Sequence, residues 1–124
     1  MKISTSELVS RTDQFASRVL RLALVLPKGM ISDVLGKQLL RSGTSVGANH
    51  REAVRSTSRA DFIAKMKIVE READETQYWL ELLRQSGLIK ESRLEPLRKE
   101  AKELTAIFTA IAKTAKSNVV NCKL

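Results

Sequence analysis

The chain has 124 residues, the usual size of one domain, and is long enough to bury a core without disulfide bonds. Hydrophobic residues make up 43% and charged residues 29%, which excludes a disordered chain, and a single cysteine excludes a disulfide framework. Lys and Arg number 22 against 14 Asp and Glu, so the net charge is +8 and acidic partners are expected.

Only 4% of the residues are aromatic, which favours helices over strands. The first helix is predicted over residues 6–26, where apolar residues recur at three- and four-residue steps and draw one stripe. Pro27 and Gly29 then end it.

The second helix is predicted over residues 32–56, with Ser32 as its N-cap. Gly36, Gly43 and Gly47 lie on one side of it, and each costs helix stability. A loop that splits the helix is one interpretation. We favour a continuous helix whose glycines let a neighbouring helix approach closely, because the apolar spacing continues across them.

The third helix is predicted over residues 58–86, with Ser58 as N-cap and Gly87 as the C-terminal cap. The fourth is predicted over residues 92–117 from a capping box that begins at Ser92, and a tail is expected after it. Short connections make consecutive helices antiparallel neighbours. Together these features predict an all-α fold, a single antiparallel up-down-up-down four-helix bundle over the whole chain.

No enzyme motif is evident. A di-iron bundle needs Glu-x-x-His pairs, and the only histidine, His50, has Gly47 three positions before it. His50 with Ser45 or Cys122 lacks an orienting third group, so we expect a polar residue on a helix flank and Cys122 in the tail. The acidic cluster of the third helix is interpreted as solvated or subunit-facing, and consists of Glu70, Glu72, Asp74 and Glu75. No catalytic residue, metal site or cofactor is predicted.

Basic residues form two strips at helical spacing, one on the second helix and one on the fourth. The first consists of Lys37, Arg41, Arg51, Arg55 and Arg59, and the second of Arg98, Lys102, Lys113 and Lys116. One interpretation of these strips is a binding surface for a phosphate backbone. The alternative interpretation is a charged helix surface that only keeps the protein in solution. Because aromatic residues do not alternate with the basic ones, any binding is expected to have little sequence selectivity.

Trp79 lies off the main apolar stripe of the third helix, on a side that it shares with Ile68. An apolar patch outside the core, flanked by acidic residues, is typical of a subunit interface. The alternative is a Trp packed sideways onto a helix of the same chain. The predicted interface comprises Gly43, Gly47, Ile68, Glu72, Glu75 and Trp79.

Two long segments resemble a known family. They are Leu39-Leu-Arg-Ser-Gly-Thr-Ser-Val-Gly-Ala-Asn49, with Glu52-Ala53 after it, and residues 61–83. They are similar to the four-helix bundle proteins called S23 ribosomal proteins, which are encoded in intervening sequences of bacterial large-subunit ribosomal RNA genes. The resemblance implies a ring-like homopentamer with a basic surface and no catalytic residues.

A related branch contains the accessory variability protein of retroelements, which associates with a reverse transcriptase and binds nucleic acid. The resemblance therefore leaves two hypotheses. One is a basic homo-oligomeric scaffold that binds RNA or DNA; the other is a structural adaptor for a protein partner such as a reverse transcriptase. No apolar run reaches the roughly 20 residues of a membrane span, and the N-terminus has no apolar signal core, so a cytoplasmic location is expected.

Overall fold

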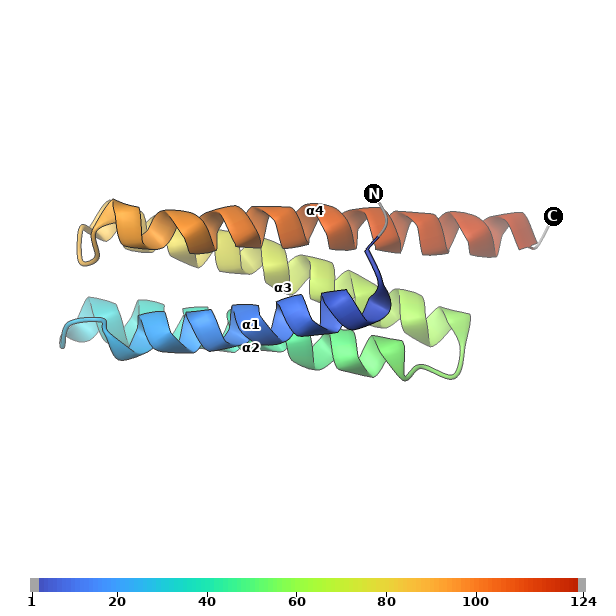
Figure 1. The fold of residues 1–124 in the computed structure, drawn as a ribbon, viewed down its shortest axis with the longest axis horizontal. Coiled ribbons are helices and arrows are strands. Elements are labelled where there is room, and N and C mark those ends of the chain that lie inside the picture. The colour runs from blue at the N-terminus through green and yellow to red at the C-terminus, as the bar shows by residue number, and fades with distance from the viewer. Residues whose placement is uncertain (1–2, 123–124) are drawn as a thin grey trace.

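A computed structural model describes the backbone of residues 3–122 and the side chains of residues 3–117, and this part of the chain holds four helices and no strand. The helices are α1 (Thr5–Leu24), α2 (Met30–Val54), α3 (Arg59–Ser86) and α4 (Glu91–Cys122). Short turns join them, and the chain runs up, down, up and down (Figure 1). The predicted all-α four-helix bundle is confirmed.

The core extends along the length of the bundle. Its largest fully buried apolar side chains are Phe15, Phe108, Leu39, Leu80, Leu83, Leu94 and Leu104. α2 packs against α1 on one side and α3 on the other, and α3 packs along α4. α1 and α4 meet along a much smaller contact, and Figure 1 shows them separated along most of α1.

Glycines allow α1 and α2 to pack closely. α2 is continuous across all three of its internal glycines, as predicted. A Cβ added to Gly43 would lie 2.8 Å from Cγ2 of Val19, and one added to Gly47 would lie 3.4 Å from the carbonyl oxygen of Thr12. Both partners belong to α1 of the same chain. The predicted close helix approach is therefore confirmed, and its partner is α1.

The helix caps agree with the sequence in α3 and differ in α2. The hydroxyl of Ser58 accepts a hydrogen bond from the Asp61 N–H at 3.1 Å, and Gly87 ends α3 in the left-handed conformation at φ 71°. In α2 the N-cap is Gly29, with φ 151°. Ser32 was the predicted N-cap. That prediction is wrong, because α2 begins before Ser32, at Met30, and Ser32 is buried.

Several helix ends also differ from the prediction. α1 ends two residues early, at Leu24, because Val25 already has a non-helical backbone. α4 begins at Glu91, which places the expected cap Ser92 inside the helix, and continues to Cys122, where a tail was expected. No glycine or proline follows residue 117 to stop it. The Cys122 side chain lies outside the described residues.

Among residues 3–122, no helix has both the length and the apolar character required to cross a bilayer.

Candidate nucleic-acid interface

The first predicted basic strip is shared between two helices. α2 ends at Val54, so Arg55 forms its C-cap and Arg59 is the first residue of α3. The prediction that Arg59 belongs to the second helix is therefore wrong. Lys37, by contrast, lies near the beginning of α2, far from Arg55 along the helix axis.

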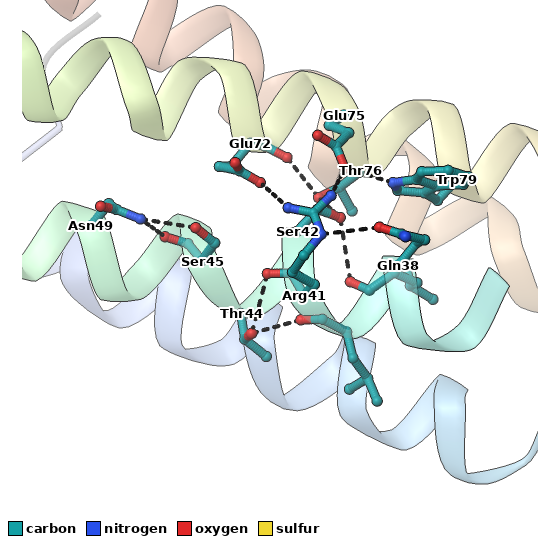
Figure 2. A network of polar contacts seen from close by, with 12 residues as sticks. Gln38, Arg41, Ser42, Thr44, Ser45, Asn49, Glu72, Glu75, Thr76 and Trp79 are labelled. Carbon is teal, nitrogen blue, oxygen red and sulfur yellow. Dashed lines mark hydrogen bonds and ion pairs between the residues drawn. The ribbon is translucent and has the colours of Figure 1, made fainter. Parts of the chain in front are cut away.

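Arg41 is occupied by carboxylates of the same chain. Its guanidinium pairs with Glu72 at 3.2 Å and with Glu75, and its Nε donates to the side chain of Gln38 at 3.0 Å (Figure 2). Glu75 also accepts a hydrogen bond from the Trp79 indole at 2.8 Å. The charge of Arg41 is thus largely neutralised between α2 and α3.

A buried polar contact lies beneath this network. The hydroxyls of Ser42 in α2 and Thr76 in α3 are 3.0 Å apart, and both residues are fully buried (Figure 2). A buried hydroxyl that lacks a partner is costly, so this pair favours one register of α3 against α2.

These contacts correct part of the predicted subunit interface. Gly43 and Gly47 are buried against α1, and Glu72 is nearly buried beneath Arg41. None of the three is free to contact another copy. Trp79 packs partly against the core of its own chain. It remains half-exposed on α3 with Ile68 and Glu75, so these positions stay a prediction.

Two further predicted residues are paired as well. Arg51 contacts Asp13 of α1 at 2.6 Å, and Arg98 contacts Glu95 at 2.5 Å and Glu81 at 3.7 Å. Helical spacing could not reveal the Arg51 and Arg41 pairs, because their partners lie on other helices. Of the nine predicted basic residues, these three are neutralised.

The other six have no ion pair within residues 3–117, and all are exposed: Lys37, Arg55, Arg59, Lys102, Lys113 and Lys116. Four of them belong to elements at one end of the bundle: Arg55 and Arg59 flank the α2–α3 turn, and Lys113 and Lys116 lie in the C-terminal part of α4. Figure 1 shows this turn and this part of α4 at the same end. A cavity of about 590 Å³ joins the two elements, lined by Arg59 and Phe62 on one side and Ile111 and Thr114 on the other. We call Arg55, Arg59, Lys113 and Lys116 the basic end.

The acidic residues close to the basic end in sequence do not cancel its charge. Glu52 is engaged by Lys65 at 3.5 Å. Asp61 lies in the first turn of α3, where a carboxylate interacts favourably with the helix N-terminus. Glu70 of α3 also reaches α4, where it accepts a hydrogen bond from Thr109 at 2.6 Å. The four unpaired cations outnumber the two carboxylates, Asp61 and Glu70, that have no ion pair within residues 3–117, so the local balance is positive.

Lys102 lies elsewhere, in a groove of about 960 Å³ between α3 and α4. Tyr78, an exposed aromatic residue that was not among the predicted site residues, lines the same groove with Lys99. The carboxylates of Asp74, Glu81 and Glu95 line it too. A groove with both signs of charge does not favour a polyanion, so the basic end remains the better site.

His50 differs from the expected flank residue. It is 1% exposed, and its ring packs edge-on against Phe108 at 5.2 Å between centroids. Burial lowers the pKa of its imidazole below the usual 6.5, and the charge of Asp13 opposes this in part. Its Nδ1 has no hydrogen-bond partner among the described residues. Among those residues, no group of three His, Cys, Asp or Glu side chains is arranged to hold a metal ion.

Comparison with known proteins places this bundle in a family. Residues 4–110 match the 23S rRNA-intervening sequence proteins. The chain belongs to this family. A solved structure of a family member, a protein with unknown function from the S23 ribosomal protein family of Bacteroides thetaiotaomicron, is 39% identical. The alignment covers 90% of this chain and 99% of that one, with a TM-score of 0.82. None of the curated proteins matches this chain.

Proposed function

We propose that this intervening-sequence protein is a non-enzymatic scaffold that binds RNA or DNA through the phosphate backbone. The observation that carries the proposal is the basic end, where Arg55, Arg59, Lys113 and Lys116 are exposed and unpaired within residues 3–117. Contacts to phosphate supply most of the affinity of non-specific nucleic-acid binding.

The geometry of the basic end suits a phosphate backbone rather than base edges. Its cations come from the end of α2, the start of α3 and the side of α4. They therefore do not form a single recognition helix that could contact base edges. The N-terminus of α3 and the C-terminus of α2 meet at this end, so their opposite partial charges offset one another and the side chains supply the positive charge. Binding is therefore expected to have little sequence selectivity and to depend strongly on salt.

The salt dependence can be estimated from the number of cations. Four phosphate contacts correspond to a slope of log K against log salt of about −3.6 for duplex DNA. Affinity should then fall about 150-fold between 50 and 200 mM salt. Fluorescence anisotropy with labelled RNA and duplex DNA, repeated over this salt range, measures the slope directly.

A matched pair of variants tests the location. Arg55→Glu with Arg59→Glu reverses two charges at the basic end, and Arg18→Glu with Arg21→Glu reverses two on α1, near the opposite end. Each pair lowers the net charge of +8 by four, so any general electrostatic effect is equal. We expect the first variant to lose at least tenfold in affinity and the second to change much less. Equal losses, or no binding by the unaltered protein at low salt, would refute the proposal.

We further propose that the scaffold is a homopentamer, supported by the family resemblance and by the half-exposed Ile68, Glu75 and Trp79 on α3. Five basic ends in one particle would bind a long nucleic acid with avidity. Light scattering should give a particle mass of five chains, and Trp79→Ala should lower it. A monomer, or a mass unchanged by the substitution, contradicts this interface.

A further inference from the structure

The opposite end of the bundle carries a groove that the nucleic-acid proposal does not use. It lies between the last turns of α1 and the first turns of α4 and has a volume of about 550 Å³. Its apolar lining includes Leu22, Leu24, Val25 and Leu97. Three arginines line it as well: Arg18 and Arg21 from α1 and Arg93 from α4.

The groove lies where α1 and α4 are not joined by an ion pair within residues 3–117. Farther along the same two helices, Arg11 of α1 joins α4 through Glu100 at 2.5 Å and Glu103 at 3.1 Å. Among the described residues, the lining of the groove includes no carboxylate, whereas α1 and α4 both contribute arginines to it. Like charges across a contact oppose close packing, which agrees with the small contact between α1 and α4.

The groove combines two features for which the rest of the described chain supplies no partner. None of its three arginines forms an ion pair within residues 3–117. Beside them, Leu24 is 74% exposed and Val25 is 48% exposed. A complementary ligand must therefore offer apolar surface flanked by negative charge.

The shape of the groove indicates the form of this ligand. Arg18, Arg21 and Val25 follow one another over about two helical turns, or roughly 10 Å. A concave, apolar path between two helices is a common docking site for an amphipathic helix. We propose that this groove binds an acidic amphipathic helix of a partner protein, with Leu or similar side chains toward Leu24 and Val25 and carboxylates toward the arginines.

Charge argues against a second copy of this chain as the occupant. The contact between copies in the proposed pentamer lies on α3, and a second copy, which carries +8, offers this groove no surplus of acidic residues. Most of the chain's own carboxylates are also committed to internal ion pairs; Glu100 and Glu103, for example, hold Arg11. The binding is distinct from the proposed function, because it uses the other end of the bundle. Together the two surfaces would make the protein an adaptor between a nucleic acid and a protein.

The experiment uses a synthetic, labelled helical peptide as the probe. One face of the peptide carries Leu at three- and four-residue spacing, and Glu flanks that face. A peptide of the same composition in scrambled order and a peptide with Lys in place of Glu are the controls. Fluorescence anisotropy with the full-length protein should show binding of the acidic amphipathic peptide at least tenfold tighter than of either control.

Variants locate the binding on the protein. Arg18→Glu with Arg21→Glu should weaken the peptide at least tenfold, and Leu24→Ser, which keeps every charge, should weaken it as well. Arg55→Glu with Arg59→Glu lowers the net charge equally and should weaken it much less. This last pair is the one expected to weaken nucleic-acid binding at least tenfold, so failure of the peptide proposal and failure of the nucleic-acid proposal give different results. Circular dichroism of each variant checks that the helices are retained.

Three results would overturn the inference. The first is equal affinity for the acidic, scrambled and Lys-substituted peptides. The second is stronger binding to anionic phosphatidylserine vesicles than to the peptide, which would indicate a lipid surface. The third is a particle mass in light scattering that changes with the Arg18 and Arg21 substitutions, which would make the groove a contact between copies.

Discussion

Replacing Gly43 with alanine tests how tightly α1 and α2 are packed. The new Cβ would lie 2.8 and 2.9 Å from the two methyl groups of Val19 and 3.2 Å from its Cβ. A carbon–carbon contact needs about 3.5 Å, so the helices must separate by about 0.7 Å. Val19 is fully buried, and its branched Cβ moves only with the backbone, so a rotamer change cannot remove the clash.

The magnitude follows from a comparison with Gly47→Ala. Both substitutions gain the same helix propensity, about 1 kcal/mol. At Gly47 the new Cβ meets only an ordinary contact, 3.4 Å from the Thr12 carbonyl oxygen, so this variant should be more stable than the parent. Gly43→Ala carries an additional overpacking cost of about 1–3 kcal/mol. The difference between the two variants should therefore be about 1–3 kcal/mol.

Urea denaturation followed by circular dichroism measures both free energies of unfolding. A double variant, Val19→Ala with Gly43→Ala, adds a control because the smaller side chain removes the clash. The free energy of unfolding of this double variant should exceed the value expected from adding the effects of the two single substitutions. If Gly43→Ala is as stable as Gly47→Ala, the close contact between α1 and α2 does not exist as described.

Three further predictions concern charged and titratable residues. Because burial lowers the pKa of His50, the unfolded state binds the imidazole proton more readily than the folded state. The contribution to stability should be complete above about pH 6.5 and fall as the pH drops below that value. Thermal melts at pH 7.5 and 5.5 should show this loss of stability, and His50→Leu should reduce it. Arg41→Gln should cost about 1–3 kcal/mol, measured in urea, since it leaves the nearly buried Glu72 carboxylate without its cation. Arg11→Gln should speed hydrogen exchange in α1, because this residue joins α1 to Glu100 of α4, and unchanged exchange would contradict that role.

The four helices could be predicted because apolar periodicity and local caps are properties of nearby residues. Ser58 and Gly87 act within their own turns, and both were found from the sequence. The start of α2 was misplaced because Gly29 caps it without a side chain, while Ser32 has the residue type of a cap but lies in the interior. Local signals cannot distinguish a capping serine from a buried one.

The site was predicted less well because it depends on the register between helices. Helical spacing correctly placed Arg41 and Arg51 on the outer side of α2, yet their partners Glu72 and Asp13 lie 31 and 38 positions away. Which cations are neutralised follows from how far each helix is shifted along its neighbour. The arginine-lined groove has the same origin, because its residues come from the two helices farthest apart in the chain.

The salt dependence of nucleic-acid binding tests the central claim most directly, because its slope counts the phosphates that the protein neutralises. Two cations fewer should make the slope less steep by about 1.8 per bound protomer on duplex DNA. We therefore expect this difference between the unaltered protein and Arg55→Gln with Arg59→Gln, measured by anisotropy from 50 to 200 mM salt. Identical slopes for the two proteins would mean that the basic end does not contact the phosphate backbone.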